Sequence, residues 1–186
     1  QVADQDWYFK ILLSDSFVYV KNAFEIINGE FLGKRVFYQD PLYIIVLASI
    51  FKLNGGVLFD VALIQILFSS LTSILIFLTA ASIYNRKAGM MAGLLFALYP
   101  VSIYYDSLIL KPSLILFILS FYFFSLTWKN QFFSIILSSV LLSLLCLLRG
   151  NFLLWIPFHF IWIYKTHLKI KEIILSFALL IMLISH

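Results

Sequence analysis

The chain has 186 residues, of which 63% are hydrophobic and 12% are charged, and its formal net charge is +4. Soluble domains carry about a quarter charged residues, so this composition excludes an ordinary soluble domain and indicates an integral membrane protein. The basic residues are scattered or lie at the ends of apolar stretches, which argues against nucleic-acid binding. The single cysteine, Cys146, excludes a disulfide framework or a thiolate metal site within the chain.

The two ends of the sequence suggest a piece of a longer protein. The chain begins at Gln1 in a polar stretch and stops at His186 inside an apolar run. We therefore expect a spanning helix before residue 1 and further helices after residue 186.

Residues 1–14 mix polar and aromatic side chains, as expected at a membrane interface. An amphipathic helix is predicted over residues 15–27, because apolar residues recur there at spacings of three and four, at Phe17, Val20, Phe24 and Ile27. Asn28-Gly29 is typical of a helix C-terminus. This helix is expected to lie on the membrane surface, with Tyr19 and Ala23 on the same face as Asp15.

Pro41 opens a second apolar run that ends at the Asn54-Gly55-Gly56 turn. Residues 42–53 would span only about 20 Å as a helix, against a hydrocarbon core of about 30 Å. The run is therefore predicted to be interfacial or re-entrant. We interpret residues 1–56 as an outer loop carrying the active site, and residues 57–186 as transmembrane helices.

Longer apolar runs fill the rest of the chain and do not alternate, which favours helices over a barrel. The sequence thus predicts an all-α, polytopic transmembrane helix bundle with interfacial helices in its first outer loop. The predicted crossings are 57–84, 88–103, 113–128, 132–148 and 152–164, and a further run begins at 173. Within them, Gln65, Thr72 and Ser73 are expected to form hydrogen bonds between helices.

The short basic turns predict the orientation. The positive-inside rule places Arg86-Lys87, Lys129 and the basic segment 165–171 on the cytoplasmic side. The alternate turns then carry Asp106, Lys111 and Arg149 to the outer side, together with the whole Asp15 loop. Ionisable residues at membrane level are costly and are functional candidates. Outer carboxylates suit a general base or a cation ligand, and a guanidinium suits a phosphate, so either an enzyme acting on a phosphorylated lipid or a transporter of anions would fit.

Short motifs along residues 15–155 resemble membrane glycosyltransferases of the GT-C type, in the branch of protein O-mannosyltransferases and aminoarabinose transferases (the family 39-like branch). Each motif alone is weak, and their order and spacing carry the likeness. Gly150 stands where relatives often have a proline, and Ile44 where they often have a second one. The motifs are DSFVYVKNA at 15–23, Gly29, FYQDPLY at 37–43, AGL at 92–94, LYP at 98–100, YYD at 104–106, LKP at 110–112 and LRGN at 148–151.

The resemblance implies an inverting transfer of a sugar, from a polyprenyl-phosphate donor to an acceptor hydroxyl of a protein, lipid or glycan, on the outer face of the membrane. It implies that Asp15 is the general base. Some relatives need a divalent cation, Mg²⁺ or Mn²⁺, so a cation requirement stays open, and no dedicated metal site is predicted. We expect an integral protein of a bacterial or archaeal plasma (inner) membrane. The expected substrate-binding residues are Tyr19, Gln39, Asp40, Asp106, Lys111 and Arg149.

The alternative is a membrane transporter or lipid flippase with a charged outer vestibule. Many transporters contain repeated halves and helices that are broken near the midplane of the membrane. This sequence shows no internal repeat. A non-catalytic scaffold would not need so polar a first loop. The sequence names neither the sugar nor the acceptor.

Overall fold

The computed structural model describes residues 14–29 and 41–166, and all of the regular structure within these ranges is helical. Gln39, Asp40 and the expected run from residue 173 lie outside them. The elements are α2 Ser14–Ile27, α3 Pro41–Asn54, α4 Leu58–Ile83, α5 Arg86–Ala97, α6 Pro100–Asp106, α7 Pro112–Ser125, α8 Gln131–Leu148, the 3-10 helix η3 Gly150–Trp155 and α9 Ile156–Thr166.

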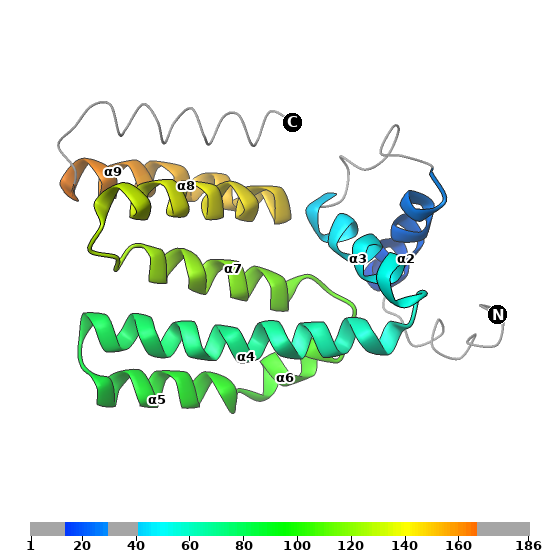
Figure 1. The fold of residues 1–186 in the computed structure, drawn as a ribbon, viewed down its shortest axis with the longest axis horizontal. Coiled ribbons are helices and arrows are strands. Elements are labelled where there is room, and N and C mark those ends of the chain that lie inside the picture. The colour runs from blue at the N-terminus through cyan, green and yellow to red at the C-terminus, as the bar shows by residue number, and fades with distance from the viewer. Residues whose placement is uncertain (1–13, 30–40, 167–186) are drawn as a thin grey trace.

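Helices α4 to α9 run back and forth roughly side by side, and the α2–α3 pair lies against one end of them (Figure 1). At that end α4 and α7 begin and α8 finishes. The opposite end holds the α4–α5 turn, the α7–α8 turn and the end of α9. The alternation of helix directions that the sequence predicts is therefore present in the fold.

Among the residues that the structure describes, two helices, α4 and α8, are long and apolar enough to cross a membrane, and the bent α5–α6 pair would be a third if it is one span. α4 agrees closely with the run predicted over 57–84, and α8 with 132–148. α7 has 14 residues and α9 has 11, so they reach about 21 Å and 17 Å, short of a hydrocarbon core of about 30 Å. The crossings expected for these two helices stay predictions.

The run predicted as one helix over 88–103 is instead two helices. α5 ends at Ala97, α6 begins at Pro100, and their axes differ by 51°. Pro100 causes the break, because it has no backbone N–H and disfavours a helical conformation at the residue before it. Tyr99 accordingly has an extended backbone. The bend turns α6 along α4 and makes Asp106 the last residue of a helix, where an open loop was expected.

α5 packs against α4 through two glycines. A Cβ atom on Gly89 would lie 2.6 Å from the Phe77 carbonyl oxygen, and one on Gly93 would lie 3.0 Å from the Ser73 carbonyl oxygen. The hydroxyl of Ser73 donates a hydrogen bond to the Gly93 carbonyl across this contact, at 2.8 Å. Small residues at such a spacing let two helix backbones approach closely.

The amphipathic helix and the short second helix are both present, as α2 and α3. Within the apolar stripe predicted for α2, Val20 is buried, whereas Phe17 and Ile27 are 47% and 36% exposed. The buried residues of α2 are Ser16, Tyr19, Val20 and Ala23, at helical spacing. This face packs on α3, where the Tyr19 and Tyr43 rings meet edge to face with centroids 5.1 Å apart.

Both predicted turns end their helices as expected. Gly29 has a φ of +86° and its N–H donates to the Ile26 carbonyl, while Gly55 and Gly56 follow α3 with φ of +70° and +87°. Positive φ at the end of a helix is the conformation that favours glycine.

Candidate functional site

The structure brings only part of the predicted site together. Asp15 lies in the first turn of α2 and is exposed, whereas Tyr19 is 5% exposed and belongs to the α2–α3 contact. We expected the two side chains to present one face to a substrate, but only Asp15 is exposed. Burial, followed by the neighbouring Tyr19, raises the pKa of the Tyr43 phenol far above its ordinary value, so Tyr43 serves as a neutral hydroxyl.

Lys111 and Arg149 lie at the end of the bundle to which α2 and α3 belong. Lys111 precedes α7 and is half-buried, and Arg149 follows α8 and is exposed. Within the described residues, no hydrogen bond or ion pair joins Asp15 to either side chain. Asp15 and Arg149 are exposed at this end of the bundle, and Lys111 is half-buried there.

Asp106 is the predicted site residue whose surroundings differ most from expectation. It is 6% exposed, although an outer-loop carboxylate was expected. Its Oδ1 atom accepts hydrogen bonds from Ser69 Oγ at 2.7 Å and from Ser113 Oγ at 2.6 Å. These donors come from α4 and α7, so one carboxyl oxygen joins three helices, and Ser69 lies near the middle of α4.

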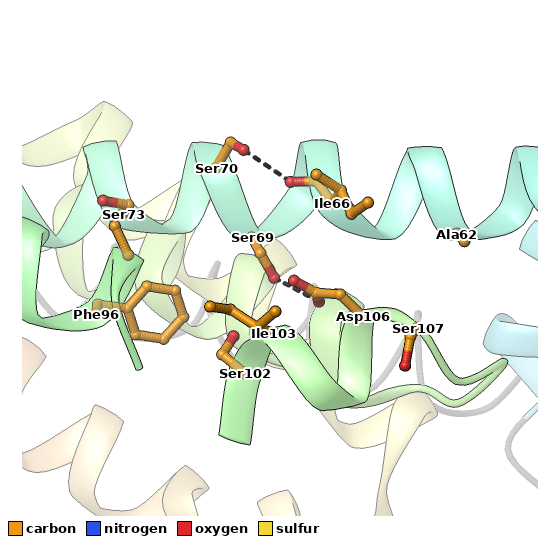
Figure 2. A pocket seen from close by; sticks show the side chains of 11 residues that line it. Ala62, Ile66, Ser69, Ser70, Ser73, Phe96, Ser102, Ile103, Asp106 and Ser107 are labelled. Atoms are coloured by element: carbon orange, nitrogen blue, oxygen red, sulfur yellow. Dashed lines mark hydrogen bonds between the residues drawn. The ribbon is translucent and has the colours of Figure 1, made fainter. Parts of the chain in front are cut away.

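A cavity of about 420 Å³ opens beside Asp106, between α4 and the α5–α6 pair. Figure 2 shows Asp106 turned toward Ser69, and the ring of Phe96 at another part of the wall. The lining combines apolar side chains with hydroxyls, and its serines are Ser69, Ser70, Ser73, Ser102 and Ser107. Sequence reasoning missed this cavity, although the serine and threonine residues at 69–73 of an otherwise apolar helix could have signalled a polar face.

Gln65 ties the first loop to this region. Its Nε2 atom donates to the Leu110 carbonyl at 2.6 Å and lies 3.4 Å from the Tyr43 hydroxyl, so it links α4 to α3 and to the segment before α7. Its Oε1 atom is buried and has no hydrogen-bond partner within the described residues. The expected hydrogen bonds between helices are thus confirmed for Gln65 and Ser73, whereas Thr72 bonds to the Phe68 carbonyl of its own helix.

A second polar cluster surrounds His159, which is 1% exposed. Its Nδ1 atom lies 3.2 Å from the Tyr122 hydroxyl, and its Nε2 atom lies 3.2 Å from the Ser139 hydroxyl. The imidazole therefore joins α7, α8 and α9 through contacts at both nitrogens. In the described part of the chain, no group of three or more histidine, cysteine, aspartate or glutamate side chains could hold a metal ion.

What each ionisable side chain can do depends on whether it lies at the end of the bundle or beside the cavity. The exposed carboxylate of Asp15 can accept a proton from a substrate that reaches the surface, and the two cations can hold an anion there. Asp106 can act only on a group that enters the cavity. Comparisons with models of protein families, with curated proteins and with solved structures find no match for this chain.

Proposed function

We propose that the chain is the catalytic part of an integral membrane glycosyltransferase, which moves a sugar from a polyprenyl-phosphate donor to an acceptor hydroxyl. One observation carries the proposal. The α2–α3 pair bearing Asp15 lies against the same end of the bundle as the start of α7 and the end of α8, next to which Lys111 and Arg149 stand (Figure 1). A carboxylate and cations at one membrane surface match the needs of sugar transfer from a lipid phosphate.

In this proposal Asp15 is the general base. Its carboxylate takes the proton of the acceptor hydroxyl while the acceptor oxygen forms a bond to the anomeric carbon. The bond from that carbon to the phosphate oxygen breaks on the opposite side, and the phosphate leaves with the electron pair. The configuration of the sugar is therefore inverted. The exposure of Asp15 supports this role, because an acceptor of any size can approach it.

The positive side chains act on the leaving group. As the bond to the sugar breaks, negative charge accumulates on the lipid phosphate. Cations nearby therefore stabilise the transition state more than the ground state. Arg149 can donate two parallel hydrogen bonds to a phosphate, and Lys111 can donate as a point charge. Gln39 and Asp40, which precede α3, remain proposed contacts of the acceptor or of a divalent cation.

A transporter is the second candidate, and one observation favours it. The α5–α6 pair is bent by 51°, and the buried carboxylate of Asp106 lies beside the middle of α4. Transporters place substrate and ion sites at broken helices near the centre of the membrane. The location of Asp15, Lys111 and Arg149 at one end of the bundle favours the transferase, since a transport path would concentrate its ionisable groups along the interior.

The deciding experiment compares Asp15→Asn with the wild type in lipid, using the full-length protein. Transfer from a polyprenyl-phosphate sugar pool is followed by mass spectrometry of glycans and lipids. We expect the variant to transfer about 10²- to 10⁴-fold more slowly, the usual contribution of a general base. Asp60→Asn, which changes an aspartate in the first turn of α4, is the matched control and should keep the wild-type rate.

Three results are informative. A slow Asp15→Asn variant with normal expression and intact donor supports the assignment. A variant at the wild-type rate would show that Asp15 is not the base. If the wild type also leaves the donor unused, the transferase proposal fails and the transporter becomes the better explanation.

A further inference from the structure

The cavity beside Asp106 has the size of a binding site for a small molecule. Its volume of about 420 Å³ falls within the usual range for ligand pockets, about 300–1,000 Å³. It lies between α4 and α5–α6, and neither Asp15, Lys111 nor Arg149 lines it. It is therefore distinct from the surface proposed for sugar transfer.

The polar groups of this cavity are arranged to accept hydrogen bonds. A serine hydroxyl carries one proton and two lone pairs. Four of the lining serines donate that proton in a hydrogen bond to an acceptor within the protein, so only their lone pairs remain available to a ligand. The donations run from Ser69 to Asp106 Oδ1, from Ser70 to the Ile66 carbonyl, from Ser73 to the Gly93 carbonyl, and from Ser107 to the Tyr104 carbonyl.

The second polar feature of the cavity is the carboxyl group of Asp106. Within the described residues, no lysine, arginine or histidine nitrogen lies within ion-pair distance of its carboxylate, and only Oδ1 receives hydrogen bonds. A carboxylate in apolar surroundings is costly unless a cation or a proton compensates it. The Oδ2 atom keeps its lone pairs for such a partner.

We propose that this cavity binds a small organic ammonium ion with an apolar body. The N–H groups of the ion donate to Asp106 Oδ2 and to the serine oxygens, and its carbon atoms contact the apolar wall. An anion, including a lipid phosphate, is excluded because the cavity offers it a carboxylate and few donors. The apolar wall consists of Ala62, Ile66, Phe96, Ala97 and Ile103.

The experiment measures binding of n-hexylammonium to the full chain in phosphatidylcholine nanodiscs, by equilibrium dialysis, with the uptake of empty discs subtracted. The neutral n-hexanol has the same apolar body and serves as the ligand control. We expect saturable binding of n-hexylammonium that is at least about tenfold tighter than that of n-hexanol, because only the cation forms an ion pair with the Asp106 carboxylate in addition to a hydrogen bond. No sugar donor is present, so the result does not depend on the proposed transferase activity.

Three variants locate the site. Asp106→Asn keeps the shape and an acceptor for Ser69 and Ser113 but removes the charge, and it should weaken binding about tenfold or more. Ala62→Leu reduces the volume of the cavity without touching the carboxylate, and it should also weaken binding. Asp60→Asn, on the same helix, should bind as the wild type does.

Equal affinities for n-hexylammonium and n-hexanol, or unchanged binding by a folded Asp106→Asn variant, would overturn the proposal. If Asp106→Asn does not fold, the ligand comparison in the wild type and the effect of Ala62→Leu decide. Discs that contain phosphatidylethanolamine distinguish the source of the ammonium group. Competition by that lipid identifies a headgroup as the occupant, and undiminished binding identifies a soluble amine.

Discussion

The hydroxyl of Ser69, near the middle of α4, lies 2.7 Å from Oδ1 of Asp106, the last residue of α6. The hydroxyl of Ser113 in α7 lies 2.6 Å from the same oxygen. One carboxyl oxygen thus connects three helices, α4, α6 and α7. The same side chain that borders the cavity also holds its walls in place.

Removing one of these donors should destabilise the fold. Ser113 is 1% exposed, so Ser113→Ala leaves a buried carboxylate with one hydrogen bond fewer. A hydrogen bond to a charged group contributes about 1.5–3 kcal/mol, and we expect the free energy of unfolding to fall by about that amount. The measurement is denaturant unfolding of the detergent-solubilised protein.

Ser70→Ala is the control for this change. Ser70 is exposed and its hydroxyl bonds only to the Ile66 carbonyl of its own helix, so its loss should change the stability by less than about 0.5 kcal/mol. Equal effects of the two substitutions would show that the contact between Ser113 and Asp106 contributes nothing specific.

The close approach of α4 and α5 gives a second prediction. Gly89→Ala would put a methyl group 2.6 Å from the Phe77 carbonyl oxygen and 2.8 Å from the Ala81 Cβ atom, both on α4. Because backbone cannot move as a flexible side chain does, the helices must separate. We expect a loss of about 1–3 kcal/mol in the free energy of unfolding, measured as above.

Gly150→Ala provides the comparison, because a Cβ atom there would meet no other atom within 4 Å. That variant should be as stable as the wild type. A Gly89→Ala variant with wild-type stability would mean that α4 and α5 are less tightly packed than the structure indicates.

The contact between α2 and α3 gives a third prediction. Ala23 is fully buried in that contact, whereas the neighbouring Lys21 is exposed. Ala23→Leu should therefore overpack the contact and cost about 1–3 kcal/mol, while Lys21→Leu should be tolerated. Limited proteolysis in detergent would detect the release of α2 as earlier cleavage between α2 and α3. Similar cleavage of both variants would contradict the buried face assigned to α2.

Much of the fold could be predicted because its signals are local. The lengths of α4 and α8 follow from uninterrupted apolar runs bounded by polar residues such as Asn85 and Asn130, whose side chains accept hydrogen bonds from the first turns of α5 and α8. The ends of α2 and α3 follow from glycines, because only a local conformation is needed there. A break at Pro100 was equally local, and it was missed because apolar character continues across it.

The site was less predictable because its contacts join residues far apart in the sequence. Asp106 meets Ser69 across 37 residues, and Gln65 meets Leu110 across 45. Nothing in the pattern around Asp106 distinguishes a carboxylate held by two serines from one in an open loop.

The distribution of the turns gives a fourth prediction, about which ends of the helices share a side of the membrane. Arg86 and Lys129 stand at the turns of one end of the bundle, and Asn54 and Arg149 close helices at the opposite end (Figure 1). In a Cys146→Ser background, single cysteines at these positions can be labelled in intact cells with a maleimide that does not cross membranes. Arg86→Cys and Lys129→Cys should resist labelling until the cells are opened, because the positive-inside rule retains basic turns in the cytoplasm. Asn54→Cys and Arg149→Cys should react at once. Labelling of Lys129→Cys together with Arg149→Cys would mean that α8 does not cross, and the proposed surface for sugar transfer would lose its assigned side.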